Sequence, residues 1–353
     1  MAIYYFCPDS DKPSGGVKQI YRHVDVLNRH GMSAYVLHKK PGFRCSWFEN
    51  DTNICNLGEE GIHRFSCRAL NKLGLLKKKP LLFPGRTVFN EKCCGGKRQK
   101  LTDKDIVVVP EFYGEWLSWG VKNLPLVIFN QNFFHTFFGY SFRKLYADGA
   151  YNSRDLRGVI TVSSHDQQAM EYTFPSVEVY RVHNGIDQSI FCPQSLKKKQ
   201  IAFMPRKCSN DALLVANILR CRGKIEEWEL VSIENLPEEK VAQILRESLI
   251  FLNFVKQESF GLPAVEAALC GCTVIGNDGV GGREFFHQDH AYTVPYGDVV
   301  TFAKTVEEVI ALYETDPSVL SCKTELFMKF AKNQYSLEQE EADVINIWKK
   351  ILS

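Results

Sequence analysis

The stretch from Leu249 to Phe286 constrains the fold of this chain most, because it alternates apolar runs with a polar loop and glycine turns. The run 249–254 has the length and composition of a buried strand. A polar loop, 256–261, follows, and Pro263 then suits the first turn of a helix that a glycine ends. The run 272–276 is typical of the next buried parallel strand. We therefore predict a β-loop-α-β unit of an α/β fold, whose loop lies where such sheets bind ligands.

Two carboxylates stand out in this unit. Glu258 lies in the loop, and Glu266 lies eight positions later, about one turn inside the predicted helix. The helix start offers unpaired N–H groups and partial positive charge to a phosphate. Glu266 could accept hydrogen bonds from ribose hydroxyls, and Glu258 could lie beside a sugar. The second loop, 277–284, includes Gly281 and Gly282, which would let backbone approach a ligand. For either glutamate alone, a carboxylate favoured by the helix dipole is the competing interpretation.

The whole string resembles a known family. E-S-F-G-L-P-A-V-E-A (258–267), with G-C-T-V-I-G and a glycine-rich turn after it, closely resembles the E-x7-E motif of family 4 glycosyltransferases. These are nucleotide-sugar-dependent enzymes with the GT-B fold. The flanking strings I-A-F-M-P-R-K (201–207) and G-G-R-E-F-F (281–286) resemble a bacterial branch of that family. The resemblance implies two facing, doubly wound, Rossmann-like domains with an interdomain cleft. It implies that the donor contacts Ser259, Phe260, Gly261, Leu262, Glu266, Gly281 and Gly282.

A basic pair follows the predicted strand 201–204. Arg206 and Lys207 could supply the fork and the point charge that bind a diphosphate and stabilise it as it departs. In the family such a pair contacts the donor phosphates, but its members are usually several residues apart, so the separate roles stay open here. We find no D-x-D sequence that suggests a metal-bridged diphosphate. We therefore expect no metal and no cofactor, with the nucleoside-diphosphate sugar as donor substrate.

The N-terminal part repeats the α/β layout. A strand at 3–7 and a helix from Val17 to about Arg29 enclose a loop that ends in Gly15-Gly16, the arrangement of a phosphate cradle. P-S-G-G-V is similar to the family's N-terminal glycine loop, which faces donor and acceptor. A lone Gly-Gly at a helix start is equally an ordinary turn.

Three further buried-type strands, 106–109, 126–129 and 158–162, end in polar or aromatic residues. The segment N-F-F-H-T-F-F-G-Y (132–140) is unusually aromatic for a loop. It is our candidate for the acceptor wall, since aromatic faces can stack on sugar rings, and core packing is the competing interpretation. His135 lies where these enzymes often keep a functional histidine, although its surroundings do not match closely.

The string H-N-G-I-D at 183–187 resembles the family's domain junction. We expect an N-terminal acceptor-side domain, a linker, a C-terminal donor-side domain and a last helix that packs back on the first domain, with bounds 1–186, 187–200, 201–334 and 335–353. The sequence of residues 39–100 indicates irregular loops and about one strand. The basic segment 92–100 could contact an anionic acceptor or lipid headgroups, or it could simply be solvated.

The net charge, the hydropathy and the cysteine content disfavour several classes of protein. The net charge of +2 does not indicate nucleic acid as a partner, and no run of about 18 apolar residues predicts a spanning helix. The N-terminus does not have the pattern of a signal peptide. The twelve cysteines include no C-x-x-C pair, which favours free thiols in a reducing cytosol. We expect a cytoplasmic protein, and peripheral contact with the inner membrane face stays open.

The resulting prediction is a glycosyltransferase that moves a sugar from a nucleoside-diphosphate sugar to a hydroxyl of a glycan or lipid-linked saccharide, as in polysaccharide biosynthesis. The resemblance implies retention of anomeric configuration. It suggests Glu258, Arg206, Lys207 and His135 as the catalytic residues. Two alternatives stay open, a phage-type enzyme that glycosylates modified DNA and a non-catalytic nucleotide-sugar-binding protein. An NAD-dependent oxidoreductase is disfavoured, because no G-x-G-x-x-G follows a predicted strand.

Overall fold

A computed structural model describes the chain at residues 1–57, 87–90, 98–116, 124–140, 142 and 149–353. The chain divides into two compact units. Unit 1 comprises 1–162, 166–182 and 341–353, and unit 2 comprises 163–165 and 183–340. The segment 187–200, which we expected to be a linker, lies within unit 2, and its last three residues begin a strand.

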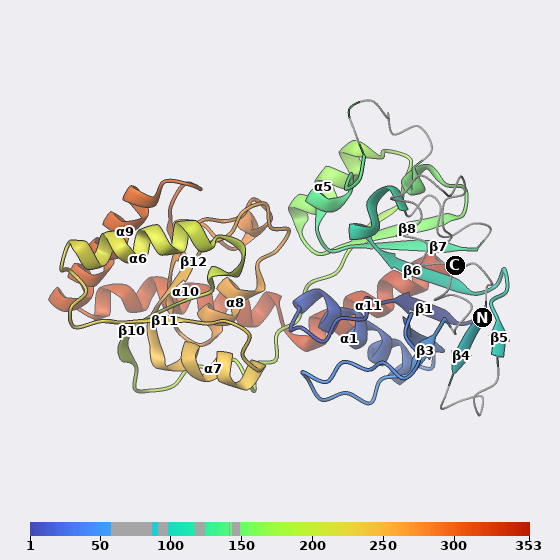
Figure 1. Ribbon diagram of the computed structural model, residues 1–353, viewed down its shortest axis with the longest axis horizontal. Helices are drawn as coiled ribbons and strands as arrows, with labels where there is room; N and C mark the ends of the chain where they lie inside the picture. Colours follow the sequence, from blue (N-terminus) through green and yellow to red (C-terminus); the bar gives the residue numbers. More distant parts are fainter. Residues whose placement is uncertain (58–86, 91–97, 117–123, 141, 143–148) are drawn as a thin grey trace, which may run out of the picture. The chain divides into compact units, whose positions relative to one another are not determined.

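Unit 1 is built on one large sheet. Its strands are β1 (Ile3–Phe6), β2 (Ala34–His38), β3 (Ile54–Asn56), β4 (Thr87–Asn90), β5 (Arg98–Lys100), β6 (Ile106–Pro110), β7 (Leu126–Asn130), β8 (Leu156–Thr161) and β9 (Val179–Arg181). They lie in the order β5-β4-β3-β2-β1-β6-β7-β8-β9 (Figure 1). Every neighbouring pair is parallel except β3–β4 and β4–β5. The carboxyl ends of β1, β6, β7 and β8 therefore share one edge.

The expectation of about one strand within 39–100 was wrong, since β3, β4 and β5 all lie there. Each has only three or four residues, and β5 reads Arg-Gln-Lys, so no apolar alternation marks it. Of the basic segment 92–100, residues 92–97 and the side chains of 98–100 lie outside the described part of the chain.

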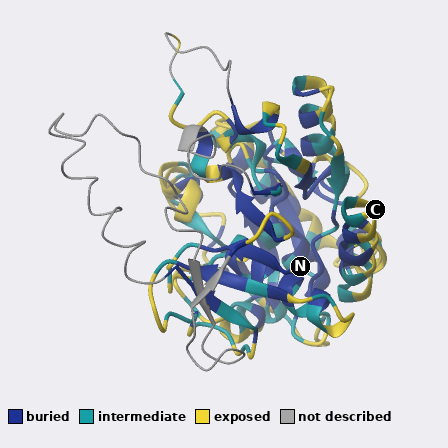
Figure 2. Cartoon of the chain, turned by 90° about the vertical axis from the view of Figure 1, so that its right-hand side faces the viewer, coloured by how far each residue is buried: buried dark blue, intermediate teal, exposed yellow. Residues whose placement is uncertain are grey.

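Helices cover both faces of this sheet. Helix α1 (Gly15–Arg29) buries Ile20, Val24 and Leu27, the apolar side that its sequence predicts. Residues 341–352 of α11 (Leu337–Leu352) lie on the same face, where the Trp348 indole donates a hydrogen bond to the Tyr5 hydroxyl at 2.9 Å. Helix α5 (Ser164–Thr173) packs on the opposite face. Figure 2 shows the parallel strands as a buried layer between these helices.

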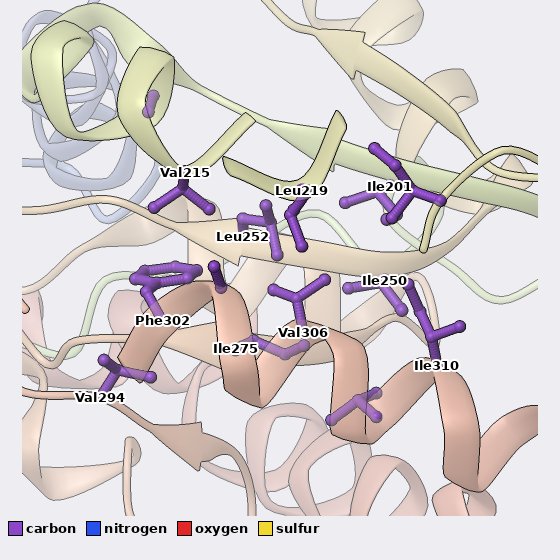
Figure 3. Close-up of a cluster of buried hydrophobic side chains, with 14 of the residues drawn as sticks. Ile201, Val215, Leu219, Ile250, Leu252, Ile275, Val294, Phe302, Val306 and Ile310 are labelled. Atoms are coloured by element: carbon purple, nitrogen blue, oxygen red, sulfur yellow. The ribbon is translucent and has the colours of Figure 1, made fainter. Parts of the chain in front are cut away.

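Unit 2 is a smaller parallel sheet with helices on both faces. Its strands are β10 (Lys198–Phe203), β11 (Glu229–Ser232), β12 (Ser248–Asn253), β13 (Thr273–Gly276) and β14 (Tyr292–Thr293), in the order β11-β10-β12-β13-β14. Apolar residues of β10, β12 and β13 meet Val215 and Leu219 of α6 (Ser209–Cys221) and Phe302 and Val306 of α9 (Val299–Thr315), as Figure 3 shows. This cluster is the core of unit 2.

The opposite face of the unit 2 sheet is covered by α7 (Glu238–Glu247) and α8 (Leu262–Leu269) (Figure 1). Helix α10 (Ser318–Gln334), which the sequence did not predict, packs against α8, α9 and β13. Among the described residues, no helix combines the length and apolarity needed to cross a membrane. All cysteines of the described part are free thiols, and most of them are buried.

Candidate functional site

The central finding in unit 2 is that Lys207 and Glu258 form an ion pair. Lys207 ends the short 3₁₀ helix η4 (Pro205–Lys207), which follows β10, and Glu258 lies in the loop after β12. Because β10 and β12 are neighbouring parallel strands, both residues reach the same edge of the sheet. Their side chains are 44% and 17% exposed, so the pair lies at the surface. Arg206 is exposed in the same short helix.

The loop of Glu258 is fixed by the glycine-rich loop that follows β13. The Glu258 N–H donates to the Gly279 carbonyl at 2.8 Å, and the Gly281 N–H donates to the Glu258 carbonyl at 2.9 Å. A Cβ at Gly281 would lie 2.0 Å from the Ser259 carbonyl oxygen, which is far too close. Gly281 is therefore required for the close approach of the two loops. Contact of Gly281 and Gly282 with a ligand stays a prediction.

Two residues beside this pairing have unusual backbone angles. Gln257 has a φ of 47° and Val280 a φ of 78°, and Val280 forms a β-bridge with Glu258. A positive φ is rare for any residue with a side chain and rarest for a β-branched one. Such strain is found where the surrounding structure enforces it, often at functional sites. The two loops therefore hold the backbone of Glu258 in a defined place.

Helix α8 begins directly after this loop. Gly261, at its N-cap, has a φ of 94°, which favours glycine. Of the residues expected to contact the donor, Leu262 and Glu266 are partly exposed, whereas Ser259 and Phe260 are buried. The Phe260 ring packs on those of Phe285 and Tyr335, at centroid distances of 5.1 and 4.9 Å. The side chains of Ser259 and Phe260 are therefore not accessible to a ligand in this structure.

Sequence reasoning missed two residues near the ion pair. The Lys256 ammonium lies over the ring of Tyr296, 5.7 Å from its centroid. Burial raises the pKa of the nearby Cys208 thiol, as Asp211 does, whereas the charges of Lys256 and Lys207 act in the opposite direction. Both lysines thus lie near the start of α6. The signal was available, because Lys256 precedes Glu258 by two residues in the motif loop.

Glu284, in the string G-G-R-E-F-F, has a structural role that its motif did not reveal. Its carboxylate accepts hydrogen bonds from the Ser164 N–H and hydroxyl, at 2.8 and 2.7 Å. Its other oxygen accepts one from the Tyr335 hydroxyl at 2.8 Å. Glu284 therefore joins the glycine-rich loop to Ser164, the first residue of α5, and to Tyr335, which precedes α11.

In unit 1, the structure brings Gly16 and His135 to one edge of the sheet. Gly15 and Gly16 open α1, and the Gln131 side chain donates to the Gly16 carbonyl at 3.2 Å. Gln131 follows β7, and its N–H donates to the Glu111 carboxylate at 2.9 Å. The other oxygen of Glu111 lies 3.8 Å from Nδ1 of His135. Glu111 was not among the site residues predicted from the sequence.

The aromatic segment 132–140 contains both residues that pack in the core and exposed residues. Phe133 packs against the core of unit 1, and Thr136 is buried, where its hydroxyl accepts a hydrogen bond from the Asn130 amide at 2.9 Å. Phe137 and Phe138 are 41% and 65% exposed. Contact of these exposed rings with an acceptor stays a prediction.

The expectation that no D-x-D sequence bears on a metal overlooked two such triplets, 9–11 and 103–105. In each triplet, at least one carboxylate binds protein groups. Asp9 accepts hydrogen bonds from His38 and from the N–H groups of Lys39 and Lys40, and buried Asp105 accepts from the N–H of Ala2 at 2.8 Å. Within the described ranges, no group of three His, Cys, Asp or Glu residues is placed to hold a metal ion.

The class of protein follows from two comparisons. Residues 218–311 match the family model described as "Glycosyl transferases group 1". This range includes Glu258, Glu266 and the glycine-rich loop, and it begins after Arg206 and Lys207. Solved structures of glycosyltransferases share the fold of the whole chain. The chain therefore has the α/β GT-B fold and carries a segment similar to group 1 glycosyltransferases.

Individual relatives and solved structures give more specific similarities. An alpha-1,6-glucosyltransferase from Actinobacillus pleuropneumoniae serotype 7 is 25% identical over 261 residues, which cover 71% of this chain and 77% of the relative. Anabaena Alr3699/HepE in complex with UDP-glucose is 12% identical with a TM-score of 0.62, and 99% of each chain is covered. A variant of S. aureus TarM, in complex with alpha-GlcNAc-glycerol and UDP among its ligands, is 10% identical with a TM-score of 0.65 and coverage of 100% and 99%.

Proposed function

We propose that this protein is a glycosyltransferase that uses a nucleoside-diphosphate sugar. The observation that carries the proposal is the Lys207–Glu258 pair beside the start of α8. We expect the cation to bind a phosphate and the carboxylate to contact a sugar, beside the positive end of a helix at one edge of a parallel sheet. The similarity of 218–311 to group 1 glycosyltransferases supports the same function.

In the proposed reaction, the departing nucleoside diphosphate carries the negative charge that must be stabilised. Lys207, Arg206 and the N–H groups at the start of α8 are suited to that electrostatic role. Glu258 would stabilise positive charge on the transferred sugar or bind its hydroxyls, and Glu266 would bind the ribose. We propose that these cations take the place of a divalent metal and that the anomeric configuration is retained.

The donor that we propose to test first is UDP-glucose. One relative is named as a glucosyltransferase, and HepE was solved with UDP-glucose bound. The proposed acceptor is a hydroxyl of a glycan or of a lipid-linked saccharide, with the exposed rings of Phe137 and Phe138 as candidate contacts. The TarM complex with alpha-GlcNAc-glycerol supports a saccharide acceptor. We further propose a cytoplasmic enzyme with peripheral membrane contact.

A thermal-shift panel of UDP-, GDP-, dTDP- and ADP-sugars, followed by a hydrolysis assay, tests the proposal. A ligand at one hundred times its Kd adds about 2.7 kcal/mol to the free energy of unfolding. We expect a rise in Tm with one nucleotide class and slow release of that nucleoside diphosphate without acceptor. A rise in Tm without any hydrolysis or transfer would instead support a non-catalytic binding protein. No shift with any donor would refute both.

A further inference from the structure

Glu111 is a buried carboxylate at the proposed catalytic edge of unit 1. It directly follows β6 as the first residue of the short 3₁₀ helix η1 (Glu111–Trp116), and its side chain is only 4% exposed. One oxygen accepts the Gln131 N–H at 2.9 Å, and the other lies 3.8 Å from Nδ1 of His135. A buried carboxylate is costly unless polar groups surround it, so both neighbours are part of its environment.

The fold explains why these residues meet. Strands β6 and β7 are parallel neighbours, so Glu111 and Gln131, which follow them, lie at the same edge. The chain then turns at once into η2 (Phe133–His135), whose N-cap is Asn132. His135 ends this turn, and its N–H donates to the Asn132 carbonyl at 3.0 Å. The histidine is thus held on a short, capped turn beside the carboxylate.

We propose that Glu111 is the positioning residue for His135, an inference that rests on the proposed function. The carboxylate favours the tautomer with a proton on Nδ1, because that proton points to a negative charge. Nε2 is then left as an acceptor for a hydroxyl of the transferred sugar or the acceptor. The 3.8 Å separation suits this role, since catalytic hydrogen bonds are often long before the ligand binds. His135 is 49% exposed and is therefore accessible to a ligand.

A second role for Glu111 would be purely structural, through its bond to the Gln131 N–H. A double-mutant cycle of Glu111→Gln and His135→Ala separates the two roles. We expect Glu111→Gln to lower kcat about tenfold in the wild-type background and less than about twofold in the His135→Ala background. Equal losses in both backgrounds would assign Glu111 to structure alone and overturn the inference. Melting temperatures of the three variants report whether the fold is kept.

A measurement that does not depend on enzymatic activity tests the positioning role of Glu111 separately from the proposed function. In protein labelled with ¹⁵N-histidine, at about pH 8 where an ordinary imidazole is neutral, NMR reports which ring nitrogen carries the proton. The His135→Ala spectrum identifies the His135 signals. We expect the Nδ1–H form in the wild type and a shift toward the Nε2–H form in Glu111→Gln. The same tautomer in both proteins would overturn the inference. If the tautomer shifts but no sugar is transferred, the positioning role stands and the proposed function fails.

Discussion

Lys207 and Glu258, 51 residues apart in the chain, form an ion pair between the loops that follow two neighbouring parallel strands. An exposed pair of this kind contributes little to stability, usually less than about 1 kcal/mol. The backbone nevertheless constrains it on one side through Gln257 and Val280, both at positive φ. Strain that stability does not explain is consistent with a role in binding.

We expect Lys207→Met and Glu258→Gln each to lower kcat/KM for the donor by at least about tenfold, because each removes a charge proposed to act on the diphosphate or the sugar. The melting temperature should change little, since the pair is exposed. Steady-state kinetics with the donor found by the thermal-shift panel measure kcat/KM, and melting curves measure the melting temperature.

Lys198→Met is the matched control for these two variants. Lys198 forms an ion pair with Glu247 in the same unit at 2.6 Å, and its side chain is 63% exposed. We expect wild-type kinetics for Lys198→Met. If all three variants lose activity equally, or none does, the special role of the Lys207–Glu258 pair is contradicted.

Gly281→Ala should impair activity far more than Gly282→Ala. The new Cβ at Gly281 would lie 2.0 Å from the Ser259 oxygen and would push the 258–260 loop away. At Gly282 the nearest atoms are 3.1 and 3.2 Å away, a contact that small shifts can relieve. We expect a fall in kcat/KM of about a hundredfold against less than about fivefold. Equal activities would show that the contact between the two loops does not set the site.

Lys256→Met should weaken donor binding by a few-fold. Lys256 rests on the exposed ring of Tyr296, close to Lys207, and its charge would attract a diphosphate. We expect the donor Kd to rise about threefold to tenfold, an effect that added salt should diminish. Calorimetric titration with UDP measures it. Lys240→Met, at an exposed position of α7, is the control, and an equal change there would mean that only overall charge matters.

Much of the fold could be predicted, because buried parallel strands leave strong apolar runs. The run 249–254 became β12, Ser248–Asn253, and the terminal helix, Leu337–Leu352, lies within the expected bounds 335–353. Helix α5 was not foreseen, since Asp166 and Met170 are its only buried residues in the described structure and no apolar stripe marks it. Helix α10 buries only Leu320, Phe327 and Ala331 over seventeen residues, which is similarly sparse.

The candidate site was only partly predictable, because its residues come together through long-range contacts. Motif residues such as Glu258 and Lys207 are visible in the sequence, but their pairing depends on β10 and β12 being neighbours. No local sequence pattern marks Glu111 as a site residue, because its proposed role depends on its proximity to Gln131 and His135 at the edge of the sheet. Long-range contacts of this kind are set by strand order, which local pattern does not encode.

Lys197→Met should destabilise unit 2 without a direct effect on the site. The Lys197 ammonium donates to the carbonyls of Arg246 and Ser248, at 3.1 and 2.7 Å, at the end of α7. A lysine there satisfies carbonyls that the helix leaves open. Losing these bonds should lower the free energy of unfolding by about 1–3 kcal/mol, measured by urea denaturation. The neighbouring Lys198→Met should not lower it comparably, and an equal loss there would contradict the capping role.

Acid should destabilise the protein partly through His23, and His23→Phe should reduce this effect. Burial, followed by the charge of Arg22, lowers the pKa of His23 to about 3, whereas an unfolded histidine titrates near 6.5. Between these values the unfolded chain binds a proton that the folded protein excludes, so stability falls as the pH drops from about 6.5 toward 3. Urea denaturation at about pH 7 and pH 4.5 should show a loss about 2 kcal/mol smaller in the variant. Carboxylates with lowered pKa values, such as Asp9 and Glu341, contribute equally in both proteins and cancel in this difference. An identical loss in both proteins would mean that His23 does not stay neutral in the folded state.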